Sequence, residues 1–120
     1  MSGIYLHVPF CRTACHYCDF HFSTSLGNVE AYVESVVSEI SLRAKRWENT
    51  TFKTLYIGGG TPSVLKKCQL QKIVDAIRKN LKCDSIWDEA TIEVNPEDVS
   101  IKALEGWIEC GFNRISIGIQ

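Results

Sequence analysis

The chain has 120 residues, a length that suits one domain, and its 45% hydrophobic and 22% charged residues are ordinary for a globular protein. The formal net charge of −1 gives no basis for binding nucleic acid. No apolar run approaches the roughly 20 residues that a membrane-spanning helix needs. The start, Met1-Ser2-Gly3-Ile4, lacks the basic and apolar regions of a signal peptide, so we expect a cytoplasmic protein whose thiols stay reduced.

The first predicted element is a strand from Ile4 to Val8. Apolar residues alternate there with Tyr5 and His7, as they do in a strand with two different faces. Pro9 ends the strand.

Three of the six cysteines follow at once, with the spacing C-x3-C-x2-C. They are Cys11, Cys15 and Cys18. Thiolates bind soft metals and iron–sulfur clusters, and because a 4Fe–4S cluster is usually held by four of them, three leave one iron free for a small molecule. The alternative is a structural zinc site with a histidine (His7, His16 or His21) as fourth ligand, although such sites tend to pair their cysteines.

The next predicted elements are a helix, a strand and a glycine turn. The helix is expected from the N-cap candidate Asn28 to about Trp47, because apolar residues recur there on one helical face. A strand from Thr51 to Ile57 runs into Gly58-Gly59-Gly60-Thr61-Pro62, where the missing Cβ atoms let the backbone approach a ligand closely. The turn matches neither a P-loop nor a dinucleotide fingerprint, and a plain strand-to-helix turn is the alternative.

The second half of the chain continues the alternation. A second amphipathic helix is predicted around Leu70 to Leu81, and a third strand from Ala90 to Asn95, which Pro96 ends. The segment between them, residues 84–89, is expected to be a polar connection.

A third helix is predicted to begin after the N-cap candidate Ser100 and to end before Gly111 at C′. Its apolar side is expected to hold Ile101, Leu104, Trp107 and Ile108. A fourth strand is predicted from Arg114 to Gln120.

This order predicts an α/β fold of parallel strands with right-handed crossover helices. Ligands of such folds bind at the carboxyl ends of the strands. The cysteine segment, the glycine turn and the corner from Glu93 to Pro96 all follow predicted strands, and Gln120 ends the fourth. We therefore expect them to share one site.

Tyr5-Leu6-His7-Val8-Pro9-Phe10-Cys11, followed by Cys15-His16-Tyr17-Cys18, resembles the opening of a radical S-adenosylmethionine (SAM) protein. Within that superfamily it is similar to the oxygen-independent coproporphyrinogen III oxidases and the related HemW haem chaperones. The resemblance covers nearly the whole chain and implies the N-terminal half of a radical SAM partial (β/α) barrel. The family has further strands and a C-terminal domain after the position of Gln120, so residues 1–120 are expected to be a truncated N-terminal portion of the radical SAM core.

The resemblance also implies the cofactors. Cys11, Cys15 and Cys18 would hold a 4Fe–4S cluster whose fourth iron is chelated by SAM. The positions carried over as cofactor-binding are Tyr5, Tyr17, Gly59, Gly60, Thr61, Glu93 and Gln120. A salt-bridged structural role for Glu93, and core packing for the two tyrosines, are the alternatives. Cys68, Cys83 and Cys110 are given no role, because free cysteine commonly behaves as a small buried hydrophobe.

Two functions compete within this family. The oxidase decarboxylates two propionate groups of coproporphyrinogen III, using SAM and an electron donor, whereas the chaperone binds and delivers haem. The oxidases have a further cysteine where this sequence has Phe20, and a longer segment before Cys11, so the chaperone is favoured and haem or a porphyrinogen is the expected further ligand. No catalytic residue is assigned, and whether the protein is an enzyme stays open. A zinc-binding module is the alternative of a different class.

Overall fold

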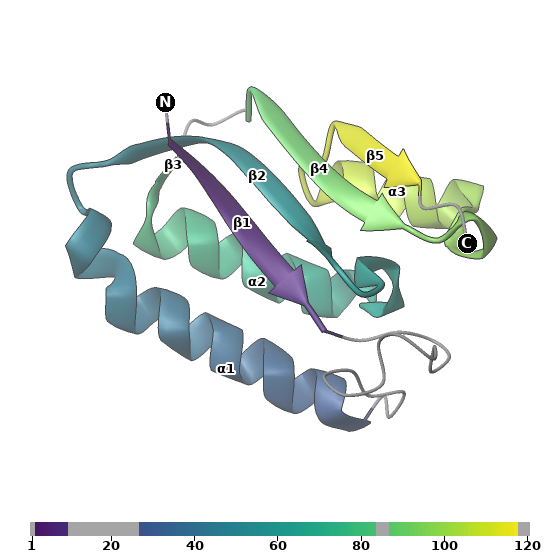
Figure 1. Cartoon of the computed structure of the whole chain (residues 1–120), viewed down its shortest axis with the longest axis horizontal. Coiled ribbons are helices and arrows are strands. Elements are labelled where there is room, and N and C mark those ends of the chain that lie inside the picture. Colours follow the sequence, from purple (N-terminus) through teal and green to yellow (C-terminus); the bar gives the residue numbers. More distant parts are fainter. Residues whose placement is uncertain (1, 10–26, 84–86, 118–120) are drawn as a thin grey trace.

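The structure is a computed structural model that describes residues 2–9, 27–83 and 87–117 (Figure 1). In chain order its elements are β1 (Ser2–Val8), α1 (Gly27–Arg43), the 3-10 helix η1 (Ala44–Trp47), β2 (Thr51–Gly59), η2 (Pro62–Val64), α2 (Lys67–Asn80), β3 (Lys82–Cys83), β4 (Glu89–Val94), η3 (Pro96–Asp98), α3 (Ile101–Glu109) and β5 (Arg114–Ile117). Strands and helices alternate along the chain, which confirms the predicted α/β class.

All strand pairs are parallel, and the strand order is β1-β2-β4-β5. Strands that follow one another in the chain therefore lie side by side, as in the wall of a barrel rather than in a doubly wound sheet. The two-residue strand β3 was not predicted. It pairs with β2 at Thr51 and Phe52, and β4 pairs with β2 from Thr54 onward.

The register divides the side chains between two faces of the sheet. Ile4 pairs with Leu55 and Leu6 with Ile57, and these apolar side chains point to one face. Tyr5 pairs with Tyr56 on the other side. We call this second side the polar face; its members are Tyr5, His7, Thr54, Tyr56, Glu89, Thr91, Glu93, Arg114 and Ser116.

The hydrophobic core lies between the apolar face and the helices, as the arrangement in Figure 1 shows. It joins strand residues to buried residues of all three α-helices, namely Val29, Val33, Val36, Leu70, Ile73, Val74, Ile77 and Trp107. The helix periodicities predicted from the sequence are thereby confirmed for α1 and α2. Burying the apolar stripe in this way also leaves the polar face of the sheet outside the core.

Details of α1 and α3 also differ from the prediction. α1 begins at Gly27, so Asn28 lies in the first turn of the helix and not at its N-cap. In α3, Ile101 and Ile108 are 77% and 68% exposed, so they do not belong to the buried side of the helix. A nine-residue helix has room for a narrow buried stripe, which Trp107 and Gly106 occupy.

The two ends of α3 follow the prediction. The Ser100 hydroxyl accepts a hydrogen bond from the Ala103 amide at 3.0 Å, the usual geometry of an N-cap. Gly111 has a φ of 106°, which favours glycine at C′. Both ends are therefore set by local sequence.

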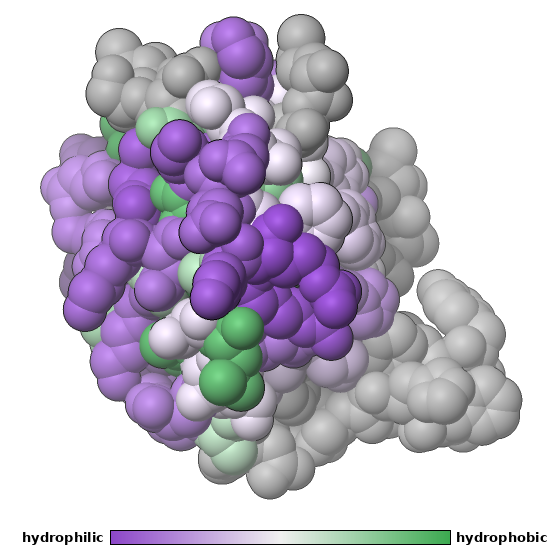
Figure 2. Space-filling view, turned by 90° about the vertical axis from the view of Figure 1, so that its left-hand side faces the viewer, coloured by the Kyte–Doolittle hydropathy of each residue, from purple (hydrophilic) through white to green (hydrophobic). Residues whose placement is uncertain are grey.

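The end of the molecule that carries η1 is mostly hydrophilic, with only small separate hydrophobic areas (Figure 2). None of the helices in the described ranges combines the length and the apolar character that a membrane span requires.

Candidate functional site

The glycine turn stands where β2 ends, beside the end of β1. The Gly60 amide donates a hydrogen bond to the Val8 carbonyl at 2.8 Å, which ties the turn to β1. Gly59 has a φ of 117°, and a Cβ there would lie 2.7 Å from Nδ1 of His7 and 2.8 Å from the Val8 carbonyl oxygen. Both the backbone conformation and the close approach of β1 therefore require glycine at position 59.

Glu93, near the end of β4, reaches across to this turn. Its Oε1 accepts a hydrogen bond from the Gly59 amide at 3.0 Å, and its Oε2 accepts one from the Tyr56 hydroxyl at 2.5 Å. The hydrogen bond to Glu93 is the main reason why the pKa of Tyr56 is raised above its ordinary value; the side chain of Ser116 has a smaller, opposite effect. Tyr56 therefore remains a hydrogen-bond donor at neutral pH.

Gly58 makes room for this contact. A Cβ at position 58 would lie 2.7 Å from both Oε1 of Glu93 and Cε1 of Tyr56. Two of the three positions in the turn thus require glycine for separate steric reasons, because Gly58 faces the Tyr56–Glu93 pair and Gly59 faces β1.

A cavity of about 180 Å³ opens between the glycine turn and the end of β4. Its lining residues are Gly59, Gly60, Thr61, Pro62, Glu93, Val94, Asn95 and Ser116. The structure thus brings together four of the predicted cofactor-binding positions. Because complete small-molecule pockets usually measure roughly 300–1,000 Å³, this cavity suits one polar part of a larger ligand.

The donors and acceptors of the cavity indicate which chemical group of a ligand it suits. The amides of Gly59 and Gly60 are both used within the protein, by Glu93 and Val8. The Glu93 carboxylate is the charged group that remains at the cavity. An acceptor-rich site of this kind suits a cationic ammonium group better than an anion.

Two loops that border the cavity are linked through Ser63. Its hydroxyl donates to Oδ2 of Asp98 at 2.6 Å and accepts from the Asn95 amide at 3.2 Å. Ser63 belongs to η2 and Asp98 to η3. The segment after β2 and the segment after β4 therefore hold each other in place.

Tyr5 lies on the polar face but does not line this cavity. Its ring stacks on Tyr56, with centroids 5.6 Å apart and an interplanar angle of 16°. The side chain is 61% exposed, so the alternative of core packing does not describe it. Its predicted contact with a cofactor stays a prediction.

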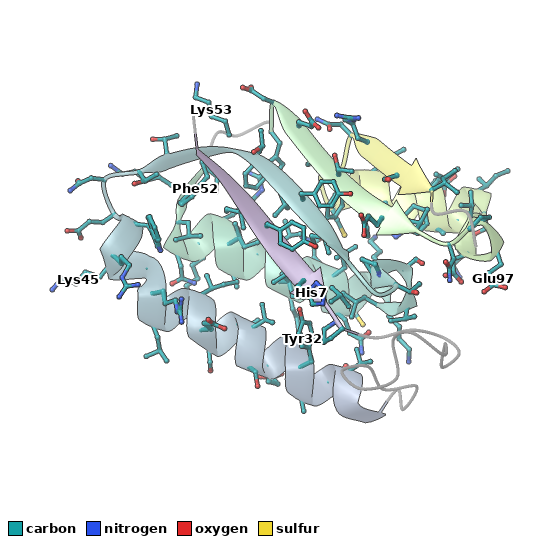
Figure 3. The ribbon with its side chains drawn as sticks, viewed as in Figure 1. His7, Tyr32, Lys45, Phe52, Lys53 and Glu97 are labelled. Carbon is teal, nitrogen blue, oxygen red and sulfur yellow. The ribbon has the colours of Figure 1, made fainter. Side chains whose placement is uncertain are left out.

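A larger hollow of about 730 Å³ lies between α1 and β1, away from the carboxyl ends of β2 and β4. Tyr32 of α1 lies beside it and points toward His7 at the end of β1 (Figure 3). Its hydroxyl donates to the His7 carbonyl, and burial, followed by the charge of Glu39, raises the pKa of Tyr32 to about 12. Although it has the greater volume, this hollow contains none of the glycine turn.

Several predicted positions lie outside the described residues. These are Cys11, Cys15, Cys18, Tyr17 and Gln120. Among the residues that the structure does describe, no three histidine, cysteine or carboxylate side chains lie close enough to hold a metal ion.

Two residues at the site were given no role by sequence reasoning: Tyr56 and Ser116. The strand alternation could have placed Tyr56, because it falls on the same side of its strand as Gly58. Nothing in the sequence showed that its hydroxyl meets Glu93, since that contact depends on the register between β2 and β4.

Comparisons with known proteins show which family the chain resembles. A family model described as the radical SAM superfamily matches residues 5–120. The chain is 38% identical to the heme chaperone HemW of Bacillus subtilis over 121 aligned positions, and 34% identical to that of Escherichia coli over 120. The alignments include 100% and 98% of this chain and 32% of each of those proteins.

A solved structure is also similar. Coproporphyrinogen III oxidase (HemN) from Escherichia coli, described as a radical SAM enzyme, superimposes with a TM-score of 0.88 at 30% sequence identity. The match covers 98% of this chain and 27% of that one. The chain therefore spans about a third or less of the relatives that it matches.

Proposed function

Because the family match extends over residues 5–120, the chain belongs to the radical SAM superfamily, and we propose that it holds a 4Fe–4S cluster and binds SAM. In this proposal the cluster ligands are Cys11, Cys15 and Cys18. Residues 1–120 form the N-terminal portion of the radical SAM core.

One observation carries the SAM part of the proposal. Gly59, Gly60, Thr61 and Glu93 line a single cavity at the ends of β2 and β4. The Glu93 carboxylate, and the use of the Gly59 and Gly60 amides within the protein, suit the amino group of the methionyl end. The small volume of the cavity fits that group and leaves the rest of SAM to lie across the polar face, where Tyr5 is exposed.

Chain connectivity supports the cluster part. Val8 accepts the hydrogen bond from Gly60, and Cys11 follows Val8 by only three residues. Three residues span at most about 11 Å, so chain connectivity alone limits the distance from Val8 to Cys11. When bound together, a reduced cluster and SAM supply a 5′-deoxyadenosyl radical in the superfamily that the sequence resembles.

We further propose that the protein acts in the manner of a haem chaperone and not of a coproporphyrinogen oxidase. Relatives named heme chaperone match this chain at 30–39% identity. Phe20 stands where the oxidases have their additional cysteine. An electron donor is a further partner, and the need for reduced cysteines favours a cytoplasmic location.

The cluster is tested by anaerobic reconstitution with iron and sulfide. We expect about four irons per chain and a brown protein, the expectation for a cluster of the 4Fe–4S type. Replacing Cys15 by Ser should abolish iron uptake, whereas Cys68→Ser, at an exposed cysteine of α2, should leave it unchanged. Uptake of stoichiometric zinc without iron would instead establish the structural zinc site.

The chaperone function is tested in the complete protein that carries this chain. The protein receives SAM, a reductant and coproporphyrinogen III without oxygen, and haem binding is measured in parallel. We expect stoichiometric haem binding without decarboxylation. Steady formation of protoporphyrinogen IX would identify an oxidase.

A further inference from the structure

We propose that Tyr56 is a positioning residue of the SAM site, whose hydroxyl holds the Glu93 carboxylate in the orientation that receives the amino group of the ligand. The inference rests on the proposed function, because it assigns a role within that site. Tyr56 was not among the predicted cofactor-binding positions, and it does not itself line the cavity.

Two hydrogen bonds hold the side chain of Glu93. One carboxylate oxygen accepts from the Gly59 amide and the other from the Tyr56 hydroxyl. A carboxylate of β4 whose two oxygens are bound by two separate groups of β2 cannot rotate without breaking one bond. Each oxygen keeps a second lone-pair position, so the carboxylate can still accept a hydrogen bond from the amino group of the ligand.

Neighbouring side chains also hold Tyr56. Its ring lies between β1 and β4, with the ring of Tyr5 stacked against it and Glu93 at its hydroxyl. Gly58 leaves the space that the ring edge and the carboxylate occupy. Tyr5, Tyr56 and Glu93 therefore form a row across three neighbouring strands, and we call this row the Tyr5–Tyr56–Glu93 row.

Core packing does not account for the Tyr5–Tyr56–Glu93 row. The core lies on the opposite face of the sheet, where Leu55 and Ile57 are 2% and 0% exposed. On the polar face, phenylalanine at position 56 would supply the same stacked ring. What tyrosine adds is the hydroxyl, and its hydrogen bond is made to the one carboxylate of the cavity.

The fixed orientation of the Glu93 carboxylate should strengthen the binding of SAM. A carboxylate that is already oriented does not have to be ordered when the ligand arrives, and such preorganisation improves affinity for the group it faces. Losing a hydrogen bond to a charged group typically weakens binding by about tenfold or more. This loss of affinity should be confined to ligands that carry the α-amino group.

The experiment compares two ligands in the reconstituted, complete protein: SAM, and a SAM analogue that lacks the α-amino group. Tyr56→Phe keeps the ring and removes the hydroxyl. We expect the dissociation constant for SAM to rise about tenfold and that for the analogue to stay within twofold of the wild type. Glu93→Gln should show the same selectivity between the two ligands. The dissociation constant of the double variant for SAM should be no higher than that of Glu93→Gln alone.

The matched control is Tyr32→Phe, which removes a hydroxyl that bonds a backbone carbonyl and lies away from the cavity. Its dissociation constants for both ligands should equal those of the wild type. A second readout is the change that SAM causes in the paramagnetic resonance signal of the reduced cluster, which should need about tenfold more SAM in Tyr56→Phe.

Two results would overturn the inference while leaving SAM binding intact. In one, Tyr56→Phe binds SAM as tightly as the wild type does. In the other, Tyr56→Phe weakens the binding of SAM and of the analogue without the amino group by the same factor, which is the pattern of a general structural defect. If the wild-type protein with its cluster does not bind SAM, the proposed function fails, and the role of Tyr56 fails with it.

Discussion

Gly58 shows how the absence of one atom can decide the geometry of a site. The position is buried at the end of β2, directly beneath the contact between Tyr56 and Glu93. Any other residue would place its Cβ within 2.9 Å of the carboxyl carbon and within 2.7 Å of the tyrosine ring. Protein atoms do not pack at such distances, so one of the two side chains would have to leave.

We expect Gly58→Ala to lower the free energy of unfolding by about 1–3 kcal/mol, the usual cost of forcing an extra methyl group into a filled space. Urea denaturation measures it. The matched control is Gly106→Ala in the interior of α3, where the new Cβ would meet Lys67 Cδ at an ordinary 3.6 Å. Because alanine favours a helix over glycine, this control should be stabilised by roughly 0.5–1 kcal/mol. Equal destabilisation of the two variants would contradict the steric explanation.

At the scale of elements, α1 is attached to β1 by Tyr32. The hydroxyl of this side chain donates to the carbonyl of His7, one residue before the end of the strand. The hydrogen bond needs the protonated phenol. Its contribution to stability must therefore depend on pH in the range where tyrosine ionises.

The pKa of Tyr32 is about 12 in the folded protein, against an ordinary value of 10.0. A group whose pKa is raised on folding stabilises the fold below the unfolded pKa, and this contribution is lost as the pH rises through the folded pKa. We expect Tyr32→Phe to be less stable than the wild type at pH 8, by about 1 kcal/mol for one lost hydrogen bond. Between pH 10 and pH 12 the difference should shrink, as followed by urea unfolding at each pH. A difference that stays constant across this window would show that ionisation of Tyr32 does not matter.

Much of the element order was predictable from the sequence, and the exceptions have physical causes. β2 and α2 follow long periodic patterns, which survive small changes of environment. β3 has only two residues, too few for any period, and exists because the edge of β2 is available to it. In α3, Ile101 and Ile108 fit the predicted stripe, but the helix turns that side of its surface outward.

The candidate site was predictable to a similar degree. Glu93, Gly59 and Thr61 were found because their motifs resemble a known family, and the structure brings them together in one cavity. The part played by Tyr56 was not foreseen, because it arises from pairing between residues that are 35 apart in sequence, such as Tyr56 and Thr91. Sequence alternation assigns a face, but only the register identifies the partner across it.

At the scale of the whole molecule, apolar side chains remain exposed toward the C-terminal part of the described chain. They are Ile101 and Ile108 of α3 and Ile115 and Ile117 of β5, all between 38% and 77% exposed. β5 also pairs with β4 alone among the described strands, so one of its edges has no described neighbour. Exposed apolar groups beside such an edge promote association between copies.

We therefore expect a protein consisting of residues 1–120 to self-associate as its concentration rises, as measured by sedimentation velocity. Ile117→Lys should shift the equilibrium toward monomer, because a charge on an edge strand opposes pairing. Leu42→Lys is the control: Leu42 is 83% exposed but lies on α1. A sample that remains monomeric at every concentration, or in which the two variants behave alike, would contradict this expectation.

The hydrogen bonds around the glycine turn have a consequence for exchange with solvent. Backbone amides at the end of a sheet ordinarily fray and exchange quickly. Here the amides of Gly59, Gly60 and Asn95 each donate a hydrogen bond to a side chain or a carbonyl of another segment. In heavy water these three amides should therefore take up deuterium as slowly as amides of the central strands. The edge of the sheet where a ligand would bind then exchanges with solvent as slowly as the interior of the sheet.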